Sequence, residues 1–164
     1  MSDRDEILVL TTGGTFDKIY FDAMSSFEVG HPVVSDLLEQ AVVKKAYRVV
    51  EILRKDSLEL TDTDRQTIRA AVLAAPNALI VITHGTDTMT DTGRVLADIL
   101  EKTIVLTGAL SPARFAETDA MFNLGMAFAT VQTSAPGVYI TMNGTVFDAT
   151  RVHKDRSRNA FIAD

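Results

Sequence analysis

Short apolar runs alternate with amphipathic stretches along this chain. Between the apolar runs, apolar residues recur at helical spacing in Ser35–Ala46 and in the stretches after Thr61 and Thr88. Thr61 with Asp64, and Thr88 with Asp91, have the spacing of capping boxes at helix starts. Five runs rich in β-branched residues are expected to be strands, namely Ile7–Leu10, Val49–Leu53, Leu79–Thr83, Ile104–Thr107 and Val138–Thr141. This alternation predicts an α/β fold with a doubly wound parallel sheet.

The order of the strands predicts where a ligand would bind. For five such units we expect the flavodoxin-like order 2-1-3-4-5, with a switch point between the first and third strands. Ligands of open α/β sheets bind beyond the carboxyl ends of the strands at such a point. Asn143-Gly144, between Val138–Thr141 and Val146-Phe147, is typical of a tight turn, so we also expect a C-terminal β-hairpin.

The segment Met121–Val131 is apolar almost all round, unlike the other predicted helices. Its large apolar side chains cannot all face one surface at 3.6 residues per turn. An apolar patch left exposed usually marks an interface. The pattern therefore predicts a homo-oligomer, a dimer or higher.

Composition narrows the class of protein. The 164 residues suit one compact domain, expected over residues 1–164 without a second domain. The net charge of −6 disfavours nucleic acid as a partner. No apolar run has the length of a membrane span and the polar start is unlike a secretory signal, so we expect no membrane contact and a cytoplasmic location. The absence of cysteine excludes thiol catalysis, and no histidine pair has metal-ligand spacing, so neither a metal nor a cofactor is expected.

Two loops rich in glycine and threonine follow the first and third predicted strands. They are Thr11-Thr12-Gly13-Gly14-Thr15 and Thr83-His84-Gly85-Thr86-Asp87-Thr88. Glycines let the backbone approach a ligand closely, and neither a dinucleotide-binding nor a nucleotide triphosphate motif is present. Each loop alone is compatible with a tight turn capped by hydroxyl groups. Together, at one switch point, they favour a binding site for a small molecule.

These two loops resemble the signature loops of the asparaginase/glutaminase family. The resemblance covers nearly the whole chain and fits the N-terminal domain of that family. It implies that Thr15 is the threonine whose hydroxyl attacks the side-chain amide carbon. It also implies that Thr86, Asp87 and Lys154 form the group that assists the attack. Whether Lys154 acts as a base or as a fixed cation stays open, because Asp87 beside it favours the charged ammonium.

The same resemblance implies a set of substrate-binding residues. Ser57 matches the serine that holds the α-carboxylate of the substrate, and Asp87 suits its α-ammonium. Ala109 occupies the position whose backbone carbonyl accepts from the amide –NH2. Gly14 and Gly85 lie in the loops whose backbone N–H groups are natural donors to the oxyanion.

This sequence departs from the family pattern in two places. The longer enzymes carry a second domain, which supplies an acidic residue to a neighbouring subunit's site. The family also has a tyrosine on the mobile segment after the nucleophile, where this chain has Phe27. Tyr20, five residues beyond Thr15, is expected to replace it as a catalytic residue. The long loop Phe16–Pro32 is expected to be a lid.

The sequence leaves several functions open. Foremost is an amidohydrolase that converts L-asparagine to L-aspartate and ammonia through a threonine acyl-enzyme. Alternatives are a hydrolase that prefers glutamine or another small amide, and a catalytically weak binding module for a small amino acid. Release of ammonia from asparagine, and its loss in Thr15→Ala, would separate the enzyme from the binding module.

Overall fold

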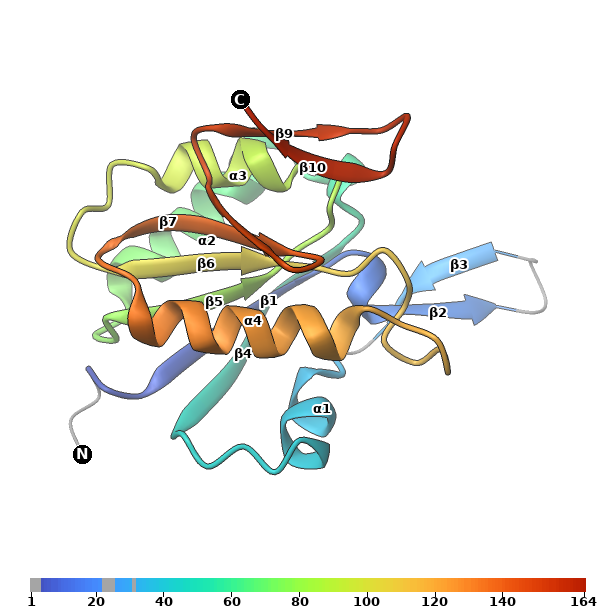
Figure 1. Ribbon diagram of the computed structural model, residues 1–164, viewed down its shortest axis with the longest axis horizontal. Coiled ribbons are helices and arrows are strands. Elements are labelled where there is room, and N and C mark those ends of the chain that lie inside the picture. Colours follow the sequence, from blue (N-terminus) through green and yellow to red (C-terminus); the bar gives the residue numbers. More distant parts are fainter. Residues whose placement is uncertain (1–3, 22–25, 31) are drawn as a thin grey trace.

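The computed structural model describes residues 4–21, 26–30 and 32–164. Its centre is a six-stranded sheet (Figure 1). Across the sheet, the strands are β4 (Tyr47–Lys55), β1 (Ile7–Gly13), β5 (Leu79–Thr83), β6 (Thr103–Thr107), β7 (Gly137–Met142) and β8 (Thr145–Asp148). All neighbours are parallel except β7 and β8. Numbered along the chain, the parallel strands have the order 2-1-3-4-5, so the predicted fold class is confirmed.

Helices cover both faces of this sheet. α1 (Val34–Gln40) and α4 (Ala120–Thr133) lie on one face, and α2 (Asp62–Ala74) and α3 (Met89–Leu96) on the other (Figure 1). Two short 3-10 turns, Thr15–Asp17 and Ser57–Glu59, follow β1 and β4. None of the described helices combines the length and the apolar character that crossing a bilayer requires.

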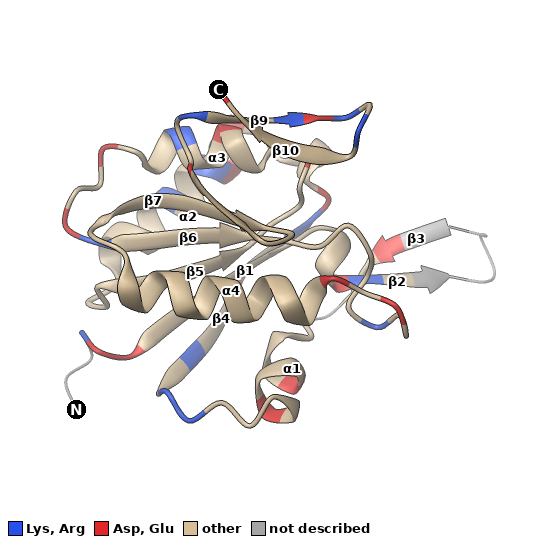
Figure 2. Ribbon diagram, viewed as in Figure 1, with Lys and Arg blue, Asp and Glu red and all other residues tan. Residues whose placement is uncertain are grey.

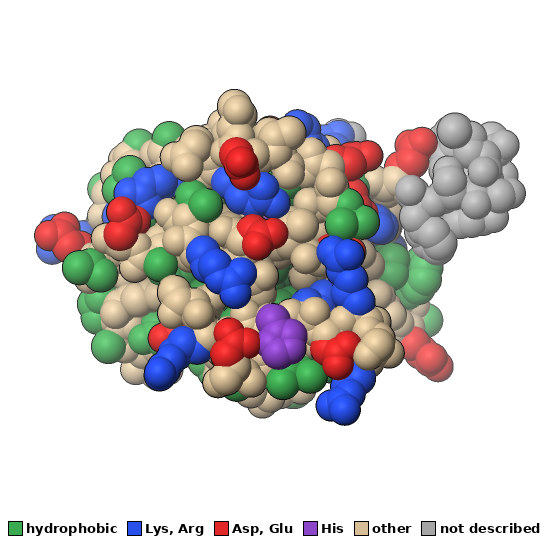
Figure 3. Space-filling view, turned by 90° about the horizontal axis from the view of Figure 1, so that it is seen from above, with side chains coloured by type: hydrophobic (Ala, Val, Ile, Leu, Met, Phe, Trp, Pro, Cys, Tyr) green, Lys and Arg blue, Asp and Glu red, His purple; other side chains and the backbone are tan. Residues whose placement is uncertain are grey.

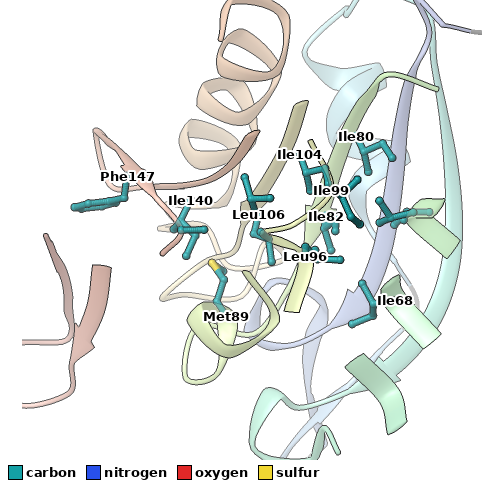
Figure 4. Close-up of a cluster of buried hydrophobic side chains, with 14 of the residues drawn as sticks. Ile68, Ile80, Ile82, Met89, Leu96, Ile99, Ile104, Leu106, Ile140 and Phe147 are labelled. Atoms are coloured by element: carbon teal, nitrogen blue, oxygen red, sulfur yellow. The ribbon is translucent and has the colours of Figure 1, made fainter. Parts of the chain in front are cut away.

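The central strands are buried on both faces, which explains their continuous apolar runs. On β5, Ile80 and Ile82 face α2 and α3, while Val81 faces α1 and α4. Figure 4 shows the first of these clusters, in which Met89 of α3 lies beside Ile140 of β7. The central strands and α4 carry no charged residue, so charge is confined to the other elements and the loops (Figure 2). The sheet is therefore a rigid platform for the loops at its carboxyl end.

Of the two capping boxes expected at helix starts, one is present. Thr61 and Asp64 form the expected capping box, in which the Asp64 N–H donates to Thr61 Oγ1 and the Thr61 N–H donates to Asp64. The second expected box is wrong, because Thr88 makes no side-chain cap to α3. Its hydroxyl donates instead to the Ser57 carbonyl at 2.8 Å. Thr88 thus connects the loop after β5 to the 3-10 turn after β4.

The helix expected over Ser35–Ala46 is shorter than predicted. α1 ends at Gln40, and Val42 adopts a left-handed conformation with φ 54°. The Val42 N–H donates to Glu39 O and the Val43 N–H to Leu38 O, which is the Schellman pattern of a helix end. Glycine is usual at the left-handed position, so valine there is no stop signal. Val42 consequently faces solvent, with 62% of its surface exposed.

The C-terminal part of the chain forms two β-hairpins. The expected turn at Asn143-Gly144 joins β7 to β8, with Met142 paired to Thr145. A second hairpin, β9 (Val152–Asp155) with β10 (Ala160–Ala163), was not predicted and lies beside α3 (Figure 1). Phe161 of β10 anchors it on the core, with its ring centroid 6.4 Å from that of Phe147.

α4 is only partly covered by the sheet. Leu124, Phe128 and Val131 are buried against it, whereas Phe122 is 60% exposed. Val146 on β8 is another exposed apolar side chain. The expectation of an oligomer therefore stays a prediction, with Phe122 as the large apolar residue of α4 that is exposed.

Candidate active site

The two glycine-rich loops meet at the carboxyl ends of β1 and β5. Gly14 has φ 85°, and a Cβ placed on it would lie 2.5 Å from Gly85 Cα. A Cβ on Gly85 would in turn lie 2.4 Å from Ser57 Cβ. Only glycine permits this backbone-to-backbone approach. The loops therefore come together at the switch point that the strand order predicted.

A cavity of about 300 Å³ opens beside these loops. Five of the residues that line it were expected from the sequence, namely Thr15, Thr86, Asp87, Ala109 and Lys154. Leu110, Arg156 and Asn159 also line it and were not expected. The residues come from four separate segments of the chain, which only the folded sheet brings together.

Lys154 is the polar centre of this cavity. Its Nζ donates to Thr86 Oγ1 at 2.7 Å and to Asp87 Oδ1 at 2.9 Å. The Lys154 side chain is 9% exposed, so its charge is compensated mainly by these partners and not by water. Because Lys154 donates to the Thr86 oxygen, the Thr86 hydroxyl proton must point to another acceptor. The arrangement places one anion and one hydroxyl within hydrogen-bond reach of one cation.

Thr15 lies in the 3-10 turn that directly follows Gly14, and the turn is held on both sides. Phe16 is fully buried, and its carbonyl accepts from the Ala113 N–H at 3.1 Å. The Asp17 carboxylate accepts from the Val33 N–H at 3.1 Å, and burial raises the pKa of Asp17 to about 6. The Asp17 carbonyl accepts from the Gly30 N–H at 2.7 Å. Asp17 therefore connects the turn of Thr15 to the chain that directly follows β2 (Lys18–Phe21) and β3 (Ser26–Val29).

A network centred on Asp119 fixes the loop of Ala109. The Asp119 carboxylate accepts from the backbone N–H groups of Leu110 and Ser111, both at 3.0 Å. Burial opposes ionisation of Asp119, yet these two N–H groups hold its pKa below the usual value. Asn123 donates to the Gly108 carbonyl at 2.9 Å. Both flanks of Ala109 are thus restrained by buried or half-buried polar groups.

His84 stabilises the loop after β5 from outside the cavity. Its Nδ1 lies 2.7 Å from the Gly85 carbonyl, and its Nε2 lies 2.7 Å from Thr92 Oγ1. A carbonyl can only accept, so Nδ1 carries the proton and Nε2 accepts from the Thr92 hydroxyl. Burial lowers the pKa of His84 to about 4, which keeps the ring neutral at physiological pH. His84 therefore orients the Gly85 backbone and does not line the cavity.

Two expected site residues lie elsewhere or are not described. Ser57 is buried behind Gly85 and is not among the residues that line the cavity. The side chains of Tyr20 and Phe27 lie outside the part of the chain that the structure describes. The replacement of the family tyrosine by Tyr20, and the lid over Phe16–Pro32, therefore stay predictions.

Arg156 and Asn159 reach the cavity from the turn between β9 and β10. Arg156 Nε lies 3.7 Å from Asp87 Oδ1, and Asn159 has the left-handed φ of 48°. In the sequence, Arg156 belongs to a basic run that is typical of a solvated surface. The sequence feature that could have predicted Arg156 at the cavity is its position two residues after Lys154. On a strand, this spacing would place Arg156 and Lys154 on the same face.

Known proteins with similar sequences and structures identify the family. A family model described as "Asparaginase, N-terminal" matches residues 6–162. The chain belongs to the asparaginase family. It is 32% identical over 170 residues to the "L-asparaginase" of Thermococcus kodakarensis, covering 95% of this chain and 50% of that protein. It is 31% identical over 159 residues to "L-asparaginase 2" of Escherichia coli, covering 90% of this chain and 46% of that protein.

Solved structures of the family agree with this assignment. The structure of the thermostable L-asparaginase from Thermococcus kodakarensis matches with a TM-score of 0.83 and 31% identity. The match covers 96% of this chain and 51% of that one. This asparaginase-family chain thus spans about half the length of the curated relatives that it matches.

Proposed function

We propose that this chain hydrolyses the side-chain amide of L-asparagine to L-aspartate and ammonia. The observation that carries this proposal is the cluster of Lys154, Thr86 and Asp87 in the same cavity as Thr15. A threonine hydroxyl is a weak nucleophile and needs such a polar environment to react at neutral pH. Membership of the asparaginase family supports the substrate class.

In the proposed reaction, Thr15 Oγ attacks the amide carbon and its proton passes to the departing nitrogen. The negative oxygen of the tetrahedral intermediate accepts from backbone N–H groups of the loops at Gly14 and Gly85. Collapse of the intermediate releases ammonia and leaves an ester on Thr15. Water then hydrolyses the ester, which regenerates the hydroxyl and releases the free acid.

The remaining site residues bind the substrate or keep its neighbours in position in this proposal. The carbonyl of Ala109 accepts from the amide –NH2, and the Asp119 network keeps that carbonyl in place. Lys154 acts as a fixed cation, because it donates to both Thr86 and Asp87. Ser57 packs against Gly85, and its expected role in holding the substrate α-carboxylate stays a prediction.

Ammonia release from asparagine tests the proposal. Thr15→Ala should lower turnover by at least about a thousandfold, as expected when an enzyme loses its nucleophile. Thr67→Ala is a matched control, because Thr67 is exposed on α2 and its hydroxyl bonds only to the Thr63 carbonyl among the described residues. Turnover retained by Thr15→Ala would refute the role of Thr15. Asparagine binding without ammonia release by the unmodified chain would favour a binding module.

The predicted homo-oligomer forms part of the same proposal. Phe122 on α4 and Val146 on β8 are exposed apolar side chains that a second copy would cover. Sedimentation at micromolar concentration should give a species larger than the 17.9 kDa chain. Phe122→Ser should shift it toward the monomer, and a monomeric unmodified chain would contradict the prediction.

A further inference from the structure

The 3-10 turn of Thr15 is tied to the loop after β4 on both of its sides. Before the turn, the Gly14 N–H donates to the Lys55 carbonyl at 2.9 Å. After the turn, Lys18 Nζ lies 2.6 Å from Asp56 Oδ2. Lys55 and Asp56 are consecutive, so the two contacts bracket Thr15 between neighbouring residues of one loop. The turn cannot shift relative to that loop unless one of these contacts breaks.

Asp56 uses its two carboxylate oxygens for different partners. Oδ1 accepts from the Leu58 N–H at 3.1 Å, which caps the 3-10 turn Ser57–Glu59, and Oδ2 accepts from Lys18. Burial opposes ionisation of Asp56, yet the hydrogen bonds from Lys18 and from the Leu58 N–H hold its pKa below the usual value. The carboxylate is therefore charged at neutral pH. One ion pair thus connects the segments that follow β1 and β4, and the second of these packs against Gly85.

Ion pairs at the surface of this protein are common, and exposed pairs usually contribute little. Figure 3 shows acidic and basic side chains interspersed on the face that carries β9 and β10. The pair of Lys18 and Asp56 differs in cover and in place. Its two side chains are only 23% and 27% exposed, and Lys18 directly follows the turn of Thr15. Loss of this pair would therefore act on the turn of Thr15 itself.

We propose that Lys18 and Asp56 are positioning residues, which hold Thr15 Oγ in line for its attack on the amide carbon. The inference rests on the proposed function and deepens it, because it names the contact that fixes the nucleophile. Neither Lys18 nor Asp56 lines the cavity, and neither exchanges a proton with the substrate. Displacement of a reacting group by about 1 Å can lower a rate by about a hundredfold. Loss of the pair should therefore lower kcat and leave KM nearly unchanged.

Steady-state release of ammonia from asparagine tests this role. Lys18→Met removes the cation, and Asp56→Asn removes the charge while it keeps an acceptor for the Leu58 N–H. Each should lower kcat by at least about tenfold with KM changed by less than about twofold, and Lys18→Arg should recover most of the loss. Arg69→Met is the matched control, because Arg69 is 24% exposed, pairs with Asp98 and does not line the cavity. An unchanged kcat for Lys18→Met, an effect on KM alone, or an equal loss in Arg69→Met would overturn the inference and leave the proposed function standing.

The double variant of Lys18→Met and Asp56→Asn separates the position of Thr15 from the charge of Asp56. The charge of Lys154 also lowers the pKa of Asp56, so an Asp56 carboxylate without Lys18 would change the field at Lys154. If position decides, the double variant should have the kcat of each single variant within about twofold, as expected for two residues that share one contact. A double variant with the kcat of the unmodified chain would show an effect of charge and overturn the inference.

Hydrogen exchange separates failure of the inference from failure of the proposed function, because it needs no turnover. In Lys18→Met, the backbone amides of residues 14–18 and 57–60 should exchange at least about tenfold faster, and in Arg69→Met they should not change. If the unmodified chain released no ammonia but exchange rose in this way, the proposed function would fail and the hold of Lys18 on the turn of Thr15 would stand. Exchange unchanged by Lys18→Met would overturn the inference, whatever the turnover.

Discussion

Replacement of Asp17 by asparagine should make the protein more stable at neutral pH. Burial raises the pKa of Asp17 from 3.8 to about 6 in the folded protein. A raised carboxyl pKa means that the folded state binds the proton more tightly than the unfolded chain. The stability that this protonation contributes is present below pH 3.8 and is lost as the pH rises through about 6. The shift corresponds to about 3 kcal/mol in the free energy of unfolding at neutral pH.

Asp17→Asn keeps the acceptor for the Val33 N–H and removes the titration. Urea unfolding of both proteins from about pH 4 to about pH 8 would give the difference between their free energies of unfolding. That difference should be near zero at the acidic end and rise to roughly 2–3 kcal/mol in favour of Asp17→Asn near neutrality. Asp36→Asn, an exposed change on α1, is the control for lost charge and should give a small, flat difference. A difference for Asp17→Asn that does not change with pH would refute the reasoning.

Four further substitutions have defined outcomes. Thr83→Val should leave the free energy of unfolding unchanged or raise it by up to about 1 kcal/mol, because the buried Thr83 hydroxyl has no partner among the described residues. Thr107→Val should lower the free energy of unfolding by about 1 kcal/mol, because the Thr107 hydroxyl donates to the Thr141 carbonyl at 2.8 Å. Denaturant unfolding measures the effect of both substitutions. Equal effects of Thr83→Val and Thr107→Val would contradict the reasoning. Val42→Gly should raise the melting temperature, because the left-handed conformation of a non-glycine residue costs roughly 1–3 kcal/mol and glycine relieves it. Lys154→Met should lower kcat for the amide substrate at least about a hundredfold, and an effect confined to KM would make Lys154 a binding residue.

The strand order and the place of the site could be predicted because they depend on local signals. The apolar runs of β1, β5 and β6 are continuous because these strands are buried on both faces, so they could be located from the sequence. Glycine marks the points of close approach, and the contact of Gly14 with Gly85 lies where the topology requires it. Thr61 and Asp64 form a box whose two partners are three residues apart, so sequence spacing suffices to find it.

Of the features that could not be predicted, two depend on distant partners and one on an unusual residue at a helix end. Thr88 bonds to the Ser57 carbonyl, 31 positions earlier, and therefore does not cap α3. α1 ends at a left-handed valine, Val42, which carries no stop signal of its own. Arg156 lies at the cavity because the turn between β9 and β10 folds back over the loop of Asp87. A basic residue near the end of the chain gives no sign of that turn.

The proposed reaction passes through a covalent acyl-enzyme on Thr15. Rapid acid quenching during turnover of a good amide substrate, followed by proteolysis and mass spectrometry, would locate the ester. The peptide that contains Thr15 should gain the mass of the acyl group, and Thr15→Ala should show no such gain. An acyl group on the peptide that contains Thr86, or full turnover by Thr15→Ala, would contradict the account.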